Sequence, residues 1–232
     1  AFGKILLRSF NPIKDGDLKM IKNKDLYSSN KEHKRVKISI PENLAFEEVK
    51  CFNEIVKPQL EEVYSYSYDK FEFKNVKIFI SKNEFPDGSK SPDTTDIKNI
   101  LNKIPEKHFE FVSDIYFVSY HCKDDNDKEI KGRTLQIIYK IIIYPKAKDR
   151  VKIILAHEIG HIVFEKILTK ELKQLFSLLI LQTFPDIRFE SIEEYTYSIN
   201  DQFANSYENF INNPKRLKEF PLIYNFFIKH IN

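Results

Sequence analysis

The sequence has few cysteines, no long apolar run and no block of charge of one sign. Cys51 and Cys122 are its only cysteines, too few for a disulfide framework. One bridge or two unpaired thiols would fit, and we expect two thiols. The longest apolar stretch, 135–144, is interrupted by Gln136 and Lys140. A membrane-spanning helix needs about eighteen or more apolar residues, so no membrane span is expected.

The charges exclude another class of partner. The 37 basic and 34 acidic residues are interspersed and leave a net charge of only +3, whereas a nucleic-acid-binding protein needs a clustered basic face. Hydrophobic residues make up 42% of the chain and charged residues 31%, which is ordinary for a globular protein. A chain of 232 residues fits one large domain, or one domain split into two lobes.

The start of the chain leaves the compartment open. Ala1 is not an initiator methionine, and no signal-like apolar segment follows it. We expect that an upstream segment was removed, but a cleaved signal peptide and a trimmed chain give the same sequence. Secretion is the working expectation.

The order of the patterns predicts an α+β protein. Residues 1–30 have few periodic apolar positions, which indicates a loosely structured arm before a single domain at 31–232. In the first lobe, 31–148, we expect strands at 36–40, 71–80, 114–120 and 135–144 and helices at 42–64 and 97–104, with Pro58 bending or ending the first helix. The second lobe, 149–232, has only helical patterns, at 150–168, 171–183, 200–212 and 221–231.

One of these helices carries His157-Glu158-Ile159-Gly160-His161, an HExxH motif. Residues four apart share a helix face, so both imidazoles can bind one metal ion. Zinc accepts neutral imidazole nitrogens, and Glu158 beside them is placed to act as general base toward a water molecule. We expect one Zn²⁺ per chain.

A chance match is the alternative to this interpretation. With the His and Glu frequencies of this chain, an accidental HExxH is expected in roughly one such chain in a hundred. The flanking apolar residues, 153–155 and 162–164, are typical of a buried helix, and Gly160 leaves room for another backbone. These flanks favour the catalytic-metal interpretation.

The third metal ligand is not fixed by the motif alone. The segment 164–169 contains neither Gly nor His, so the HExxHxxGxxH pattern of metzincins is absent. Glu165 is one turn beyond His161, too far along the same helix to complete the ligand set, and a surface charge is its better interpretation. The carboxylates that remain are Glu190, Glu193, Glu194, Asp201 and Glu208.

The segment from Asp201 through Phe203, Ala204 and Asn205 to Tyr207 resembles the E-x-F-A-E-x-F helix of the anthrax lethal factor and Pro-Pro endopeptidase family. The resemblance implies a zincin-like fold with the active-site helix between the two lobes. It also makes Asp201, forty residues after His161, the third zinc ligand. The chain departs from the family at two positions. Asp201 is shorter than the family's Glu, so this helix must approach the metal more closely. Asn205 stands where the family has its second acid.

The same resemblance implies an active-site tyrosine seven residues before the third ligand. Glu194 holds that position here. We expect Tyr195 to take the role through a contraction of one residue, with Tyr197 as the alternative. Asn200 is expected to cap the helix, in which case Asp201 could instead merely complement the helix dipole.

These features predict a zinc endopeptidase acting on a peptide or protein substrate. The strand at 135–144 would lie along the cleft and could pair with an extended substrate. Two alternatives stay open: a catalytically silent binding module on the same fold, as related toxins carry, and a chain whose HExxH is structural. If the protein acts inside a host cell, a separate delivery or translocation partner is needed.

Overall fold

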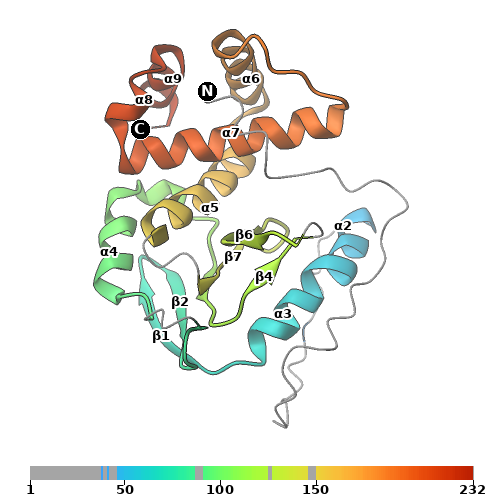
Figure 1. Cartoon of the computed structure of the whole chain (residues 1–232), viewed down its shortest axis with the longest axis vertical. Helices are drawn as coiled ribbons and strands as arrows, with labels where there is room; N and C mark the ends of the chain where they lie inside the picture. Colours follow the sequence, from blue (N-terminus) through green and yellow to red (C-terminus); the bar gives the residue numbers. More distant parts are fainter. Residues whose placement is uncertain are drawn as a thin grey trace.

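The computed structural model describes residues 38, 41, 46–86, 91–124, 127–145 and 150–231. The predicted arm at 1–30 and the predicted strand at 36–40, apart from Ile38, lie outside these residues. Strands occur only before residue 145 in the described part of the chain, and 150–231 consists of helices and their connections (Figure 1). The α+β prediction is therefore confirmed.

The first helical run changes its hydrogen bonding just before a proline. It consists of helix α2 (Phe46–Cys51), the π-helical segment η1 (Phe52–Val56) and helix α3 (Lys57–Tyr64). Pro58 has no N–H to donate to the preceding turn, and the N–H of Lys57 bonds to the carbonyl of Phe52, five residues back. A wide turn thus replaces the predicted end or kink, and the helix continues to Tyr64.

Two segments predicted as single strands are β-hairpins, so both predictions were wrong. Strands β1 (Tyr68–Phe73) and β2 (Val76–Ser81) flank a two-residue turn in which Lys74 and Asn75 have φ of 48° and 66°. Two such residues in succession make the primed turn that matches strand twist. Strands β6 (Gly132–Leu135) and β7 (Lys140–Ile143) flank the turn 136–139, where Tyr139 has φ of 53°. Apolar residues 137–139 continue through the second turn, which conceals it in the sequence.

A mixed five-stranded sheet has the order β1-β2-β3-β7-β6. Strand β3 (Asp114–Phe117) lies parallel to both β2 and β7, while the two hairpins are antiparallel. Helix α4 (Thr94–Lys103), capped by Asp93, connects β2 to β3. A third hairpin pairs β4 (Cys122–Lys123) with β5 (Glu129–Ile130). Cys51 and Cys122 are unpaired, as expected.

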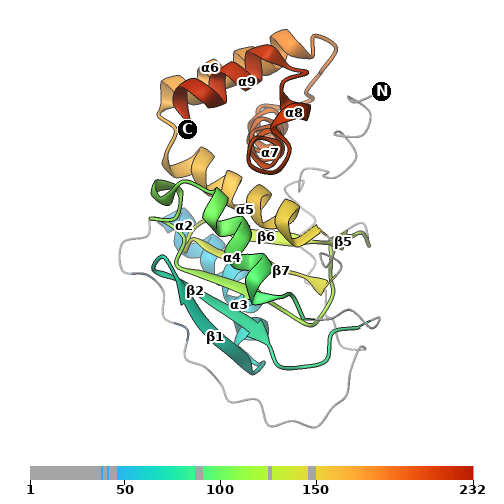
Figure 2. The same ribbon diagram turned by 90° about the vertical axis from the view of Figure 1, so that its left-hand side faces the viewer.

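Helices cover both faces of the sheet. Leu60 and Val63 of α3 pack on one face, where Tyr116 and Ile142 face them. Helix α4 and helix α5 (Val151–Lys166) cover the other face, and α4 and α3 lie on opposite sides of the sheet in Figure 1. Helix α5 is consequently buried on two sides, between the sheet and the helices that follow (Figure 2).

Four further helices form the last layer. They are α6 (Lys170–Thr183), α7 (Ile192–Asn212), α8 (Pro214–Leu217) and α9 (Pro221–His230). Helix α7 begins eight residues before the predicted start at Asn200, because Ser191 is its N-cap and accepts a hydrogen bond from the N–H of Glu194. In the described part of the chain, no helix has the length and apolar character needed to cross a membrane.

Helices α5 and α7 cross at unusually short distance. A Cβ added to Gly160 would lie 2.9 Å from Cα of Ala204 and 3.2 Å from Cβ of Tyr207, closer than side chains tolerate. The expectation that Gly160 leaves room for another backbone is confirmed. The two small residues bring α7 down onto the face of α5 that carries the two histidines.

Candidate metal centre

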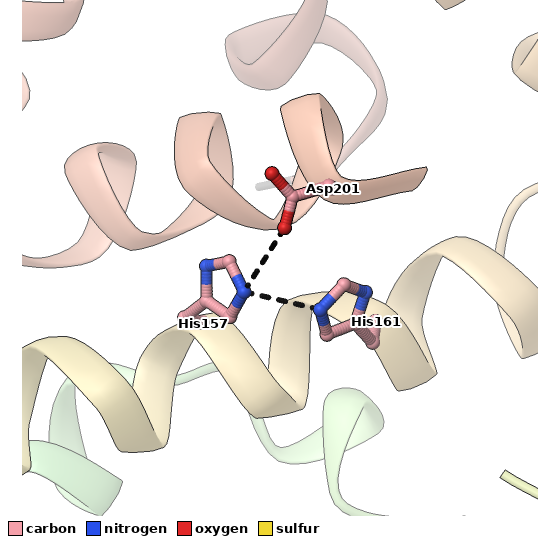
Figure 3. Close-up of side chains that lie close together, drawn as sticks. All are labelled: His157, His161 and Asp201. Atoms are coloured by element: carbon pink, nitrogen blue, oxygen red, sulfur yellow. Dashed lines mark hydrogen bonds and ion pairs between the residues drawn. The ribbon is translucent and has the colours of Figure 1, made fainter. Parts of the chain in front are cut away.

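His157, His161 and Asp201 form a cluster at the crossing of α5 and α7 (Figure 3). Nε2 of His157 lies 3.1 Å from Nε2 of His161 and 3.5 Å from Oδ1 of Asp201. One potential ligand atom from each residue lies within 4.8 Å of the others. Among the described residues, this is the one group of three His, Cys, Asp or Glu side chains close enough together to hold a metal ion. The crossing of α5 and α7 brings these groups together.

Asp201 lies in the middle of α7, as the tenth of its 21 residues. Asn200 is therefore not a cap, and the dipole interpretation of Asp201 is wrong because a helix dipole acts within the first and last turns. The side chain of Asp201 is only 15% exposed. Burial raises the pKa of this carboxyl, while His161 and a hydrogen bond from Asn205 lower it. A carboxylate in this position requires cationic or hydrogen-bonded partners.

Both imidazoles have a hydrogen-bond partner on α7. Nδ1 of His161 lies 2.8 Å from the side-chain oxygen of Asn200, and His157 forms a side-chain hydrogen bond with Asn205. Asn205 also donates to Oδ2 of Asp201 at 2.9 Å. An amide oxygen only accepts, so Nδ1 of His161 carries the proton and its Nε2 presents a lone pair to the cluster.

His157 is held in the neutral form that metals bind. Burial lowers its pKa to about 3, and the neighbouring His161 acts in the same direction. A neutral imidazole has one nitrogen with a lone pair. The nitrogens of His157 and His161 and the oxygen of Asp201 thus provide two nitrogens and one oxygen, a donor set that zinc accepts.

Glu158 is buried beside the cluster, with 6% of its surface exposed. Its Oε2 accepts a hydrogen bond from Oγ1 of Thr134 on β6 at 2.7 Å. Burial raises the pKa of Glu158, whereas His161, Thr134 and Arg133 lower it and Asp201 raises it further. A carboxyl group whose proton affinity is raised is a better general base than an exposed one.

Strand β6 lies so close to α5 that a side chain at Gly132 would displace Glu158 or Ile154. A Cβ on Gly132 would be 2.6 Å from Oε1 of Glu158 and 2.7 Å from Cγ2 of Ile154. Gly132 and Thr134, two residues apart on one face of the strand, therefore fix where the Glu158 carboxylate lies. Neither residue was found in the sequence, because nothing in the pattern relates this strand to Glu158.

The same strand is an edge of the sheet. The N–H of Tyr144 donates to the carbonyl of Lys131 at 2.9 Å, and Gly132 is opposite Ile143. Antiparallel pairs alternate, so the backbone groups of Gly132 and Thr134 point away from β7, toward an edge that no strand of the described residues covers. The strand expected at the cleft was 135–144, but β7 is interior, and the strand beside Glu158 is 132–135.

The structure separates the two candidate tyrosines. Tyr195 packs its ring against Phe189 at 5.1 Å between centroids and belongs to the periphery of the core. Tyr197 is half-exposed, and its pKa is raised by partial burial and by the charges of Asp201 and Glu158. Positions four apart share a helix face, whereas positions six apart do not. Tyr197, not Tyr195, lies on the Asp201 face of α7.

The other carboxylates that the sequence left open do not join the cluster. Glu194 accepts from the N–H of Glu190 at 2.5 Å and belongs to the N-terminal cap of α7. Glu193 is exposed in the first turn of the same helix. Glu208 lies two turns beyond Asp201, near Arg216 and Arg150, and its pKa is raised to about 7, chiefly by burial. Glu165, excluded as a ligand, contacts Lys173 on α6.

No protein-family model matches this chain, and a search of curated proteins found no match in sequence.

Proposed function

We propose that the protein is a zinc-dependent endopeptidase with a zincin-like catalytic domain, in which His157, His161 and Asp201 hold the metal. The observation that carries the proposal is the convergence of two imidazole nitrogens and one carboxylate oxygen at the crossing of α5 and α7. Nε2 of His157 lies 3.1 Å from Nε2 of His161 and 3.5 Å from Oδ1 of Asp201, so one divalent cation could be held by all three residues. Three protein ligands and one open position are the composition of a catalytic zinc site.

When bound, zinc would act as a Lewis acid and lower the pKa of a water molecule to about 7. Glu158 supplies the base. Its buried carboxylate takes a proton from the attacking water and can pass it to the leaving amine. Thr134 orients that carboxylate by donating to Oε2 and leaves Oε1 to receive the proton.

Tyr197 and β6 account for the remaining steps of peptide hydrolysis. The Tyr197 phenol, with its proton held by a raised pKa, can donate a hydrogen bond to the oxyanion as the carbonyl is attacked. An extended peptide can add to the open edge at Gly132 and Thr134 by backbone hydrogen bonds. That register places its scissile bond beside Glu158, the residue that Thr134 binds.

The close helix crossing supports full ligation by the shorter carboxylate. Asp201 has one methylene fewer than the Glu of the family that its segment resembles, and Gly160 with Ala204 brings α7 closer to α5. Asn205, in place of the family's second acid, connects His157 to Asp201. Both departures are thus compatible with an active enzyme, and they weaken the alternative of a decayed binding module.

The first test measures the zinc content of the protein and the effect of replacing Glu158. We expect purified protein to contain about one zinc per chain, and Glu158→Gln to keep the zinc while losing cleavage of a proteome-derived peptide library by several orders of magnitude. Glu61→Gln, an exposed site on α3 across the sheet, is the control and should cleave as wild type does. Absence of stoichiometric metal, or near-wild-type cleavage by Glu158→Gln, would overturn the proposal.

A further inference from the structure

A series of side-chain contacts extends from the metal-ligand cluster to Lys173 on α6. The side-chain oxygen of Asn200 lies 2.8 Å from Nδ1 of His161, and its amide nitrogen lies 3.0 Å from Oε1 of Glu165. Oε2 of Glu165 lies 3.0 Å from Nζ of Lys173. These contacts therefore connect Lys173 on α6 to Glu165 on α5, then Asn200 on α7, and finally His161 on α5.

The side chains of Lys173 and Glu165 determine which group donates and which accepts in every contact of this series. Lys173 has donors only, and a carboxylate has acceptors only. Glu165 can therefore bind Asn200 only through the amide N–H₂, which turns the amide oxygen toward His161. With that oxygen facing it, His161 must carry its proton on Nδ1. Its Nε2 is then left with the lone pair that faces His157 and Asp201.

From this geometry we infer that Glu165 is a positioning residue that sets the tautomer of His161 through Asn200. The inference rests on the proposed metal site for its purpose, but the tautomer is a property of the metal-free protein. Glu165 is 33% exposed and Lys173 28% exposed, so the pair is partly shielded from water and keeps its geometry. A ligand's distal hydrogen bond typically changes metal affinity 10- to 100-fold.

Without Glu165, the amide of Asn200 is free to rotate. Its N–H₂ can then face His161, which stabilises the opposite tautomer, with the proton on Nε2 directed into the cluster. Glu165→Gln is a sharper change than Glu165→Ala because it keeps the size. In glutamine, the position of either Oε1 or Oε2 is taken by an N–H₂ group, which is a donor facing another donor, so either Asn200 or Lys173 loses its acceptor.

The test is ¹⁵N NMR of the imidazoles in metal-free protein at about pH 8, where an ordinary imidazole is neutral. We expect Nδ1 of His161 to show the shift of a protonated nitrogen and Nε2 that of an unprotonated one. In Glu165→Ala and Glu165→Gln, the two nitrogens should move toward averaged shifts. Zinc affinity, measured by competition with a chromophoric chelator, should fall about 10- to 100-fold in Glu165→Ala and less in Glu165→Gln.

Glu61→Ala on α3 is the matched control for loss of one carboxylate and should change neither the shifts nor the affinity. A wild-type His161 protonated on Nε2, or unchanged shifts in both Glu165 variants, would overturn the inference. If wild type binds no zinc but its tautomer still depends on Glu165, the proposed function fails and the inference stands. If zinc binds and the tautomer is independent of Glu165, the inference fails and the proposed function stands.

Discussion

At the scale of single residues, two tyrosines of α7 differ in what they face. Tyr197 lies one turn before Asp201, and its pKa responds to Asp201 and Glu158. We expect Tyr197→Phe to keep its zinc and to lose about a hundredfold or more in turnover, because an oxyanion donor is removed. Steady-state cleavage kinetics and metal analysis of each variant measure this.

Tyr195→Phe provides the control on the same helix. Its ring contact with Phe189 survives the loss of the hydroxyl, so turnover should stay near wild type. The original sequence expectation, Tyr195 as the donor, would be restored if Tyr195→Phe were crippled and Tyr197→Phe were not.

Asp201 gives the second prediction at this scale. Asp201→Ala removes one of the three proposed ligands and leaves Asn205 without its carboxylate partner, so we expect zinc affinity to fall by several orders of magnitude. Zinc should also raise the melting temperature of wild type and not of the variant, because a ligand stabilises only the state that binds it. Substituting Glu193, Glu194 and Glu208 in turn tests the other carboxylates. If one of these variants lost zinc and Asp201→Ala kept it, the third ligand would be that glutamate and not Asp201.

At the scale of secondary-structure elements, the crossing of α5 and α7 determines whether Asp201 reaches the histidines. In an exposed helix, replacing Gly by Ala stabilises by about 1 kcal/mol. At Gly160 we expect the opposite, a loss of about 1 to 3 kcal/mol in urea unfolding, since the new Cβ would meet Ala204 at 2.9 Å. Zinc affinity should fall in parallel as α7 moves away.

A compensating change sharpens this prediction. If the loss of zinc affinity in Gly160→Ala comes from distance, adding Asp201→Glu should recover part of it, because the extra methylene restores reach. Recovery of affinity without recovery of stability would separate the two effects. No recovery at all would mean that the crossing does not set the ligand distance.

At the scale of the whole molecule, a buried histidine connects the sheet-bearing part to the helical part. His108 is fully buried, and its Nδ1 lies 2.8 Å from the hydroxyl of Tyr207 on α7. Burial, with a smaller effect of Lys107, lowers its pKa to about 4. Between an ordinary histidine pKa of about 6.5 and about 4, the unfolded chain binds a proton that the folded chain refuses.

Stability should therefore fall as the pH drops through this window. We expect urea unfolding of metal-free wild type to lose up to about 1.4 kcal/mol per pH unit from His108 alone. His108→Gln, which keeps a polar side chain but does not ionise, should show a shallower slope. His157 is common to both proteins, so the difference between them isolates His108. Equal slopes would show that His108 is protonated in the folded state.

The sequence alone determined the parts of this protein that depend on local periodicity. His157 and His161 share a face because a helix repeats every 3.6 residues, and 150–231 is helical because its apolar positions follow that period. The motif therefore predicted two ligands and a base without knowledge of the fold. Asp201 was predicted as the third ligand from the resemblance of a short helical segment to the helix of a known family.

Local signals were also present where the predictions failed. Ser191, three residues before Glu194, is the signature of a helix start. Placing the start at Asn200 instead hid the helical spacing that relates Tyr197 to Asp201. Lys74-Asn75 is a weak turn signal, and residues 136–139 have none, so the continuing apolar pattern was taken for single strands.

Only the tertiary structure decided what surrounds the cluster. Gly132 and Thr134 reach Glu158 from a strand more than twenty residues earlier, and Asn200 joins His161 to Glu165 across two helices. These pairs follow no spacing rule, because they depend on how closely α5 packs against β6 and α7. Sequence periodicity places side chains on a face, but the distance between faces depends on the residues that pack at each crossing.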